Sequence, residues 1–525
     1  MLMLNGSSGV CPTRQLLERV YQYLGDGAFL ALPALTWLDS SDTMLVSVCV
    51  AGVVLSLMVI AGVLTGPCLA LLAILYLTIV NGGGVFTEFQ SDGLLVEATV
   101  IALFLVSWRP LERPWKGAPP LSTPPAISLW LIRFLLFRLM FAAGLVKLMS
   151  GDPTWQDLSA MAYHYETQPI PSPAAWLFYH LPLPVHKLES AATFVIELLA
   201  PLLMLFGSRC RLIAGISFIL LHAMIIVTGN YSFLNYLTAF LSICLIEDRY
   251  LEKILPGWLV SCLIPGEMQE DGQTSPSDKQ HGQIRLTTTA LAAVLFLLGA
   301  FRFLAGLGVY LPAPIITGLR AAAPYHIANS YGMFAVMTTQ RPEIVFEGSD
   351  DLTHWQEYSF KFKVDRLDKA PPLMAPHMPR LEWRLWFEAM DVSRTEPWVL
   401  NLCHLMLRGD REVRRMFGPG PFLDSKPPRY LRAFVYDYHF TDFKGLEKGQ
   451  WCWRDNKRLF IPPVELDGEF IKPVSGSEEA REIRLRSYPL CRNVRSCGTR
   501  DTAPGAGALS ISRRWFALSR YRCPS

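Results

Sequence analysis

The sequence predicts a polytopic α-helical membrane protein of about eight spans, with an α+β aqueous domain after the last span. Three observations predict this class. Hydrophobic residues make up 51% of the 525 residues and gather in long runs, and the charged share of 18% lies below the ~25% of soluble proteins. The mean hydropathy is +0.27. Beyond Tyr325 the long apolar runs are replaced by alternation of apolar and polar residues, the pattern of half-buried strands.

The membrane spans are predicted by length. A hydrocarbon core of about 30 Å is crossed by about 20 apolar residues in a helix. The second, third and seventh predicted spans are short by this criterion, and Gly66-Pro67 separates the first from the second. The predicted spans lie near residues 43–64, 68–84, 93–108, 127–149, 188–206, 212–228, 233–246 and 286–307, in a membrane domain of residues 43–308.

Lysine and arginine predict the orientation of the spans, because the cations of short loops gather on the cytoplasmic side. Cations precede the fourth span and lie between the fifth and sixth and between the seventh and eighth: Arg109, Arg113, Lys116, Arg209, Arg211, Arg249, Lys253, Lys279 and Arg285. This pattern makes residues 1–42 an outer N-terminal segment and puts the aqueous domain in a lumen or periplasm. The first residues show no signal-peptide pattern, so a membrane span is expected to direct targeting.

The aqueous α+β domain is predicted over residues 325–464. Alternation in PEIVFEGSDDLTHWQEYSFKFKV predicts a β-hairpin, and YLRAFVYDYHFTDF and WCWRDNKRLFI predict further strands. RLEWRLWFEAM and WVLNLCHLMLRGDREVRRMF have helical spacing. Whether Cys403 and Cys452 pair stays open, because a disulfide needs an oxidising compartment and close Cα atoms. Residues 465–525 are rich in Arg, Ser and Gly without an apolar period, which predicts disorder.

The most informative residues are charges inside the predicted spans. Arg133, Arg138 and Lys147 interrupt the apolar run of the fourth span. An arginine at a helix centre costs about 2.5–3.5 kcal/mol on insertion scales, so Arg138 is expected to face protein or a watery cavity and to have an acidic partner. The candidates are Glu97 and Glu197, each within a span of its own. Arg133 and Lys147 lie near opposite ends of the span, where long side chains are able to snorkel.

This intramembrane polar cluster has two interpretations. It is either a polar cavity or proton-handling site, or a set of buried ion pairs that fix helix packing; the second is favoured because buried pairs need no catalytic role. No nucleophile-elbow, zinc-protease, phosphate-loop or dinucleotide-binding signature occurs in a suitable context. We therefore expect no catalytic residue, cofactor or metal. The net charge of +3 indicates no nucleic-acid partner.

An aromatic outer loop follows the fourth span. It begins with Tyr163, His164, Tyr165 and Glu166 and continues into a stretch punctuated by proline. Amphipathic aromatic residues suit a membrane-interface belt and a protein-binding surface equally well, so both interpretations stay open. Asn5 and Asn230 each begin a glycosylation sequon, but the pattern is short and the second lies against the membrane, so neither is taken as a modification site.

Seven segments carry patterns typical of one family. They are LLFRLMFAAGLVKL (135–148), YHYETQPIPSPAAW (163–176), HKLESAATFVIE (186–197), TGNYSFLN (228–235), IANSYGMF (327–334), PHMPRLEWRLWFEA (376–389) and PPRYLRAFVYDYHF (427–440). On these segments the chain resembles the lipase maturation factors, multispan membrane proteins of the endoplasmic reticulum with relatives in bacteria. The fourth segment supplies the motif residues Gly229, Asn230, Tyr231 and Asn235.

The resemblance implies a membrane-bound chaperone that is not an enzyme and that helps secreted lipases to fold and assemble. Its implied partners are membrane lipids and lipase clients, in the endoplasmic reticulum membrane of a eukaryote or the inner membrane of a bacterium. Family members usually begin with a further membrane helix, so the N-terminus looks shortened, and the tail after Val464 resembles no family C-terminus. Five aromatic residues of the aqueous domain are expected mainly in its core: Trp383, Trp386, Phe387, Trp451 and Trp453.

Two other functional classes stay open. The family distantly resembles the membrane region of vitamin K-dependent carboxylases, and an intramembrane enzyme of that kind would use Lys147 as a proton-handling base. A small-molecule transporter would use Arg138 as an anion site. The sequence shows no internal repeat of the kind common in transporters.

Overall fold

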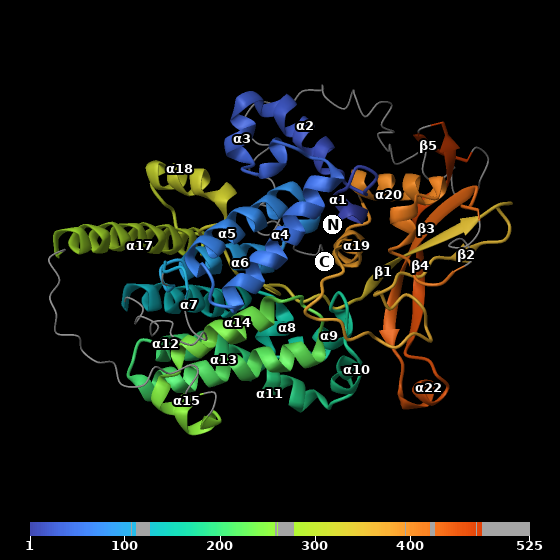
Figure 1. Cartoon of the computed structure of the whole chain (residues 1–525). Coiled ribbons are helices and arrows are strands. Elements are labelled where there is room, and N and C mark those ends of the chain that lie inside the picture. Colours follow the sequence, from blue (N-terminus) through green and yellow to red (C-terminus); the bar gives the residue numbers. More distant parts are fainter. Residues whose placement is uncertain are drawn as a thin grey trace.

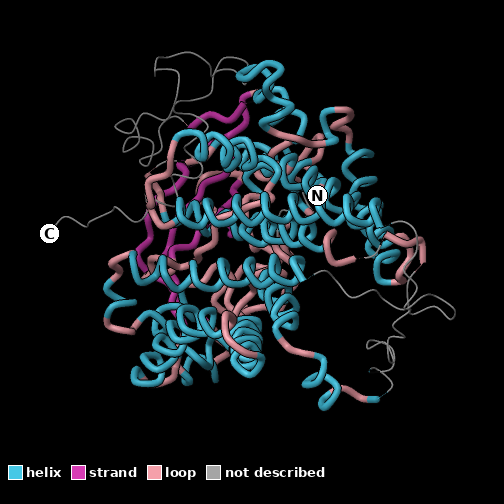
Figure 2. Tube along the Cα trace, turned by 90° about the vertical axis from the view of Figure 1, so that its left-hand side faces the viewer, coloured by secondary structure: helices cyan, strands magenta, loops and turns pink. Residues whose placement is uncertain are grey.

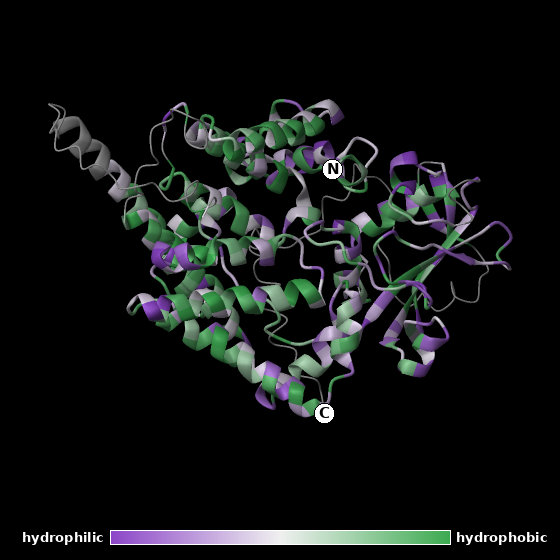
Figure 3. Cartoon of the chain, turned by 60° about the horizontal axis from the view of Figure 1, so that its bottom comes forward, coloured by the Kyte–Doolittle hydropathy of each residue, from purple (hydrophilic) through white to green (hydrophobic). Residues whose placement is uncertain are grey.

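A computed structural model describes residues 1–106, 108–111, 126–257, 260, 278–393, 395–420, 426–468 and 470–474. The chain forms a membrane part, built of helices, and a C-terminal domain around one β-sheet (Figure 1). Figure 2 shows the strands gathered behind the helices on one side of the molecule. In Figure 3 apolar residues dominate the long helices, and polar residues are dense on the C-terminal domain.

Five helices among the described residues are long and apolar enough to cross a bilayer: α4 (Asp42–Ile60), α5 (Thr65–Gly82), α7 (Ala126–Met149), α13 (Ser208–Thr228) and α17 (Asp278–Gly306). They match the first, second, fourth, sixth and eighth predicted spans. The Ser41 hydroxyl accepts the Met44 amide and caps α4, which satisfies one otherwise free donor of the first turn. Only Leu45 and Val48 of α4 are buried, and its other apolar side chains are partly or fully exposed, as a lipid-facing helix requires.

The count of eight spans is not confirmed, because the third, fifth and seventh segments are shorter or broken. The third is α6 (Gln90–Ala102), and the seventh is α14 (Leu234–Ser242) continued by η5 (Ile243–Leu245). The fifth consists of α11 (Leu183–Phe194), a π-helical turn η4 (Val195–Leu199) and α12 (Ala200–Leu203). Pro201 has no amide proton to donate to the Glu197 carbonyl, so the ordinary helix pattern is interrupted at this turn.

Shorter helices flank and connect the membrane helices. In the N-terminal segment they are α1 (Leu2–Asn5), α2 (Thr13–Leu24), η1 (Gly25–Gly27), α3 (Ala28–Ala31) and η2 (Leu35–Trp37). The others before the C-terminal domain are η3 (Gly84–Thr87), α8 (Pro153–Gln156), α9 (Ala160–Thr167), α10 (Pro173–Tyr179), α15 (Asp248–Ile254), α18 (Ala313–Ala322) and η6 (Ala323–Tyr325).

The C-terminal domain contains an antiparallel sheet of order β2-β1-β3-β4-β5. Its strands are β1 (Pro342–Ser349), β2 (Gln356–Glu357), β3 (Tyr430–Phe440), β4 (Cys452–Asp467) and β5 (Phe470–Pro473). The predicted hairpin is confirmed as β1 and β2, although β2 has two residues. The predicted helices are α19 (Arg380–Met390), α20 (Pro397–Arg408) and α21 (Arg411–Arg414), and α22 (Phe443–Glu447) joins β3 to β4.

Alternation along the strands gives the sheet two buried faces. Ile344, Phe346 and Val435 pack in the cluster that contains α19 and α20. Val345 and Tyr436 face the other way and share a cluster with Tyr165 and Trp176 from α9 and α10. The sheet is therefore covered by its own helices on one face and by the membrane part on the other.

The structure answers three questions that the sequence raised about the C-terminal region. Residues 465–467 and 470–473, assigned to the disordered tail, form the end of β4 and its partner β5, while residues 475–525 lie outside the described residues. Cys403 and Cys452 are free thiols in different core clusters on opposite faces of the sheet, so they do not pair. Of the five aromatic residues expected in the core, Trp383 and Trp386 are buried, whereas Trp453 is 47% exposed.

The chain after α18 returns among the membrane helices before it enters the sheet. The Asn329 side-chain nitrogen Nδ2 donates to the Gly93 carbonyl of α6 over 3.0 Å. Tyr331 lies in the core cluster shared by α6, α7 and α13. Residues 327–334, which the sequence pattern assigns to the aqueous domain, thus pack inside the membrane part, and the first strand begins at Pro342.

Candidate functional site

Arg138 of α7 is paired with Glu97 of α6. Both side chains are 3% exposed, and Arg138 Nη1 also donates a 3.2 Å hydrogen bond to the Asn329 carbonyl. An unpaired arginine at this depth would be far more costly, so the observed pairing explains how the charge is tolerated. Of the two predicted partners, Glu97 is the one that Arg138 contacts.

Glu97 also anchors the segment that returns into the membrane part. Its Oε2 atom accepts the Asn329 amide at 3.0 Å, the Asn329 side-chain amide at 3.0 Å and the Tyr331 hydroxyl at 2.7 Å. Gly93, one turn earlier on α6, allows this approach, since a Cβ atom there would lie 3.1 Å from the Asn329 side chain. One buried carboxylate therefore joins α6, α7 and the chain that leads to the C-terminal domain.

Lys147 forms the second buried pair, with Glu197. Its Nζ atom lies 2.9 and 2.8 Å from the two carboxylate oxygens, and the side chains of Lys147 and Glu197 are 6% and 10% exposed. Of the two arrangements open to Lys147, snorkelling and burial, the structure has the buried one, because the π-helical turn brings Glu197 directly to it. Gly144 makes room for the turn: a Cβ atom there would approach the Glu197 Cβ to 2.9 Å.

Arg133 stands apart from both pairs. It is partly exposed, and its guanidinium lies 5.8 Å from the centre of the Trp130 ring. This arrangement fits the snorkelling predicted for an arginine near a helix end. The five polar residues thus form two separate ion pairs and one peripheral cation, and each buried base faces its own acid.

The outer-loop motif is internal, which corrects both the membrane-belt and the binding-surface interpretations. His164, Tyr165 and Glu166 are buried on α9, and only Tyr163 reaches 38% exposure. A Glu166 carboxylate oxygen accepts the Phe440 amide of β3 over 2.7 Å. The motif is therefore part of the contact between the membrane part and the sheet.

Burial shifts the pKa values of two residues at this contact, His164 and Glu166. Removal from water lowers the pKa of His164 to about 4, helped by the nearby Lys147 charge, so the imidazole is neutral at physiological pH. Its ring stacks with that of Tyr231, with ring planes 7° apart. Burial likewise raises the pKa of Glu166, while the Phe440 amide and His439 oppose that shift.

Asn230 of the family motif ties two loops together. Its side-chain nitrogen donates to the carbonyls of Ile170, Pro171 and Pro372 at 3.2, 3.3 and 2.8 Å, and its oxygen accepts the amides of Met374 and Ala375 at 2.9 and 3.2 Å. The residue is 1% exposed and has no room for a glycan.

The neighbouring motif residues have packing roles. Gly229 lies so close to Gln168 that a Cβ atom would be 2.2 Å from the amide oxygen. Asn235 Oδ1 lies 2.8 Å from His222 Nδ1 on α13. The motif therefore fixes the outer end of α13 and the start of α14.

Asp92 and Arg380 form a link that the sequence patterns did not reveal. Arg380, at the start of α19, donates to the two Asp92 carboxylate oxygens at 2.7 and 2.6 Å, and the Tyr76 hydroxyl donates to the same carboxylate at 2.6 Å. Arg380 also donates to the Phe86 carbonyl at 2.7 Å. The sequence contains two hints of this link. Asp92 directly precedes the predicted span 93–108, and Arg380 is the one arginine of the segment PHMPRLEW.

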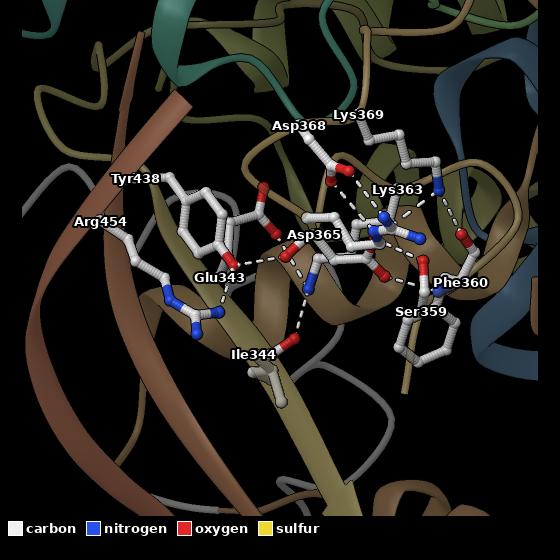
Figure 4. A network of polar contacts seen from close by, with 11 residues as sticks. Glu343, Ile344, Ser359, Phe360, Lys363, Asp365, Asp368, Lys369, Tyr438 and Arg454 are labelled. Carbon is white, nitrogen blue, oxygen red and sulfur yellow. Dashed lines mark hydrogen bonds and ion pairs between the residues drawn. The ribbon is translucent and has the colours of Figure 1, made fainter. Parts of the chain in front are cut away.

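A polar network holds the loop after β2 against the sheet (Figure 4). Lys363 pairs with Glu343 at 3.0 Å and donates to the Ile344 carbonyl at 2.5 Å. Asp365 accepts the Ser359 hydroxyl at 2.9 Å, and its carbonyl accepts the Tyr438 hydroxyl at 2.7 Å. β2 pairs with only Glu347 and Gly348 of β1, and the Lys363 ammonium satisfies the Ile344 carbonyl beyond that short pairing.

Among the described residues, no group of three or more histidine, cysteine or acidic side chains is positioned to hold a metal ion. The buried acids at the site are instead matched with bases or amides, as in the pairs above. This arrangement holds helices and domains together.

Comparison with known proteins identifies the family. Residues 1–253 match the family model of the lipase maturation factor transmembrane domain, and residues 327–462 match that of the lipase maturation factor C-terminal domain. Human lipase maturation factor 1 is 31% identical over 93% of this chain and 86% of its own. The chain belongs to the lipase maturation factor family.

Other members of the lipase maturation factor family give the same result. Human lipase maturation factor 2 is 33% identical over 92% of this chain and 82% of its own, and chicken lipase maturation factor 2 is 31% identical over 88% and 78%. No solved structure matches the chain significantly. The family match and the five long apolar helices make the chain a multi-pass membrane protein.

Proposed function

We propose that this chain is a membrane-bound maturation factor that assists the folding and assembly of secreted lipases. The observation that carries the proposal is similarity to lipase maturation factors 1 and 2 across both the membrane part and the C-terminal domain. The family points to the endoplasmic reticulum membrane, with the C-terminal domain in the lumen among its clients.

The geometry supports a role that is not enzymatic. Lys147 and Arg138 each face a carboxylate within hydrogen-bonding reach, so their charges are used in holding helices. The motif residues His164 and Asn230 are engaged with neighbouring protein groups. Nothing in the comparisons favours an intramembrane enzyme or a transporter.

The proposal is tested by expressing the full chain, together with a secreted dimeric lipase, in cells that lack their own maturation factor. We expect lipase activity per unit of secreted lipase protein to rise. A secreted phosphatase, expressed in the same cells, serves as the control and should keep its specific activity. An unchanged lipase, with the chain correctly inserted in the membrane, would remove the lipase role.

A further inference from the structure

The N-terminal hairpin, residues 13–38, exposes many large apolar side chains. Tyr23 is 79% exposed, Leu30 70% and Leu38 84%. Three more residues of the hairpin, Tyr21, Leu24 and Phe29, are also exposed. A concentration of large apolar residues on a surface indicates contact with another apolar body.

The two sides of α2 differ in chemistry. Arg14 and Glu18 pair across one turn at 2.9 Å, with side chains 76% and 55% exposed, and they face water. At about 100° per residue, the opposite side of the helix carries buried Leu17, half-buried Leu16 and Val20, and exposed Tyr23 and Leu24. The helix is amphipathic, so it is suited to lie in the plane of an interface rather than to cross a membrane.

Hydrogen bonds fix the hairpin at the height of a bilayer boundary. The Leu35 amide donates to the Thr78 hydroxyl over 3.1 Å, and the Asn81 side chain donates to the Pro33 carbonyl over 2.8 Å. Both Thr78 and Asn81 lie in the last turns of the membrane helix α5, which ends at Gly82. At 1.5 Å per residue, Thr78 is about 6 Å from that end.

The exposed surface is also continuous with a lipid-facing helix. Leu38 lies four residues before Asp42, where α4 begins, and only Leu45 and Val48 of α4 are buried. In Figure 1 the hairpin lies beside α4 and α5, away from the sheet. A lipid surface that covers α4 would therefore reach the hairpin.

Aromatic residues of the hairpin cluster near the bilayer boundary at the end of α5. The Phe29 ring lies 4.9 Å from Trp37 and 6.1 Å from Tyr21, and Trp37 donates its indole hydrogen to the Leu32 carbonyl over 2.8 Å. Tyrosine and tryptophan concentrate where a membrane meets water, because their rings suit both the acyl and the headgroup region.

We propose that the N-terminal hairpin is a membrane-interface anchor, inserted by Tyr23, Phe29 and Leu30 into the boundary between headgroups and acyl chains of the outer leaflet. The occupant of the exposed surface is lipid. Arg14 and Glu18 remain on the aqueous side. The anchor braces the N-terminal segment against α5 independently of any client that the protein assists.

The test uses the full chain in microsomes that contain a phospholipid with an alkyne on its acyl chain. The photocrosslinking residue p-benzoylphenylalanine replaces Tyr23 in one variant, Leu30 in a second and Glu18 in a matched control on the opposite face of α2. We expect lipid adducts at positions 23 and 30 to exceed those at position 18 several-fold. Addition of Phe29→Glu and Leu30→Glu should abolish the adduct at position 23, whereas Leu30→Met should preserve it.

Two outcomes would overturn the proposal. A discrete protein adduct at position 30, in place of lipid, would make the surface a protein-docking site. Equal and low lipid labelling at positions 18, 23 and 30, in a chain of unchanged thermal stability, would mean that the hairpin stands in water. Neither outcome depends on lipase activity, so failure of the anchor is distinguishable from failure of the proposed function.

Discussion

Substitutions in the Lys147–Glu197 pair test whether these two charges stabilise the fold or take part in catalysis. Glu197→Leu leaves the Lys147 ammonium buried without the two carboxylate contacts at 2.9 and 2.8 Å. Removal of one member of a buried pair costs about 3–5 kcal/mol, whereas replacement of both members by apolar residues is often neutral. We therefore expect Glu197→Leu and Lys147→Leu each to be strongly destabilising and the double variant to be close to the parent chain.

The measurement is a thermal midpoint in lipid nanodiscs at one fixed scan rate, because membrane proteins often unfold irreversibly. At ~2 °C per kcal/mol, the single substitutions should lower the midpoint by about 6–10 °C. Leu148→Ala, at an exposed neighbouring position on the same helix, is the matched control and should change little.

Lipase maturation by the same variants completes the test. If the double variant is stable and supports normal lipase specific activity, the pair is structural, as the geometry indicates. A double variant as unstable as the sum of the single changes would refute the pairing argument. A stable but inactive double variant would instead show that Lys147 or Glu197 takes part in function, and would favour the intramembrane enzyme as the alternative.

Three further predictions follow from other contacts. Arg380→Leu removes three hydrogen bonds to Asp92 and Phe86, so limited proteolysis should release the C-terminal domain faster, whereas Arg384→Leu, whose 3.4 Å contact with Glu88 is longer and partly exposed, should not. The buried Asn5 and Asn230 should carry no N-glycan in the mature protein, so endoglycosidase treatment should leave its electrophoretic mobility unchanged. Burial raises the pKa of Glu382 from 4.5 to about 7, so the folded state holds a proton that the unfolded chain has lost, and stability should fall as pH rises from about 4.5 to about 7. Glu382→Gln should flatten that dependence in thermal scans across pH. Above pH 7 it should raise the free energy of unfolding by about 1.4 kcal/mol for each unit of pKa shift; an unchanged slope would contradict the assignment.

The sequence alone determined the class of protein and most of its elements. Long apolar runs predict α4, α7 and α13 because the thickness of a bilayer sets the length of a span, and alternation predicts β1 and β3 because successive side chains face opposite sides of a strand. Both signals are local. They failed where length was short or the helix was interrupted, as at α6 and at the π-helical turn that contains Glu197.

The sequence also determined which residues needed an explanation. An arginine and a lysine in an apolar run require compensation wherever they lie, because removing a charge from water is costly in any apolar surroundings. For this reason the apolar runs alone single out Arg138, Lys147, Glu97 and Glu197. Asp92 and Arg380 were missed because neither lies deep in an apolar run.

Only the tertiary structure decided how these residues are used. The choice of Glu97 for Arg138 and Glu197 for Lys147 depends on which helices are neighbours, and sequence periodicity does not contain that information. The burial of α9 against β3 is likewise a contact between segments more than 250 residues apart. Hydrogen bonds act over about 3 Å, so partners are fixed by the packing of distant segments rather than by their own composition.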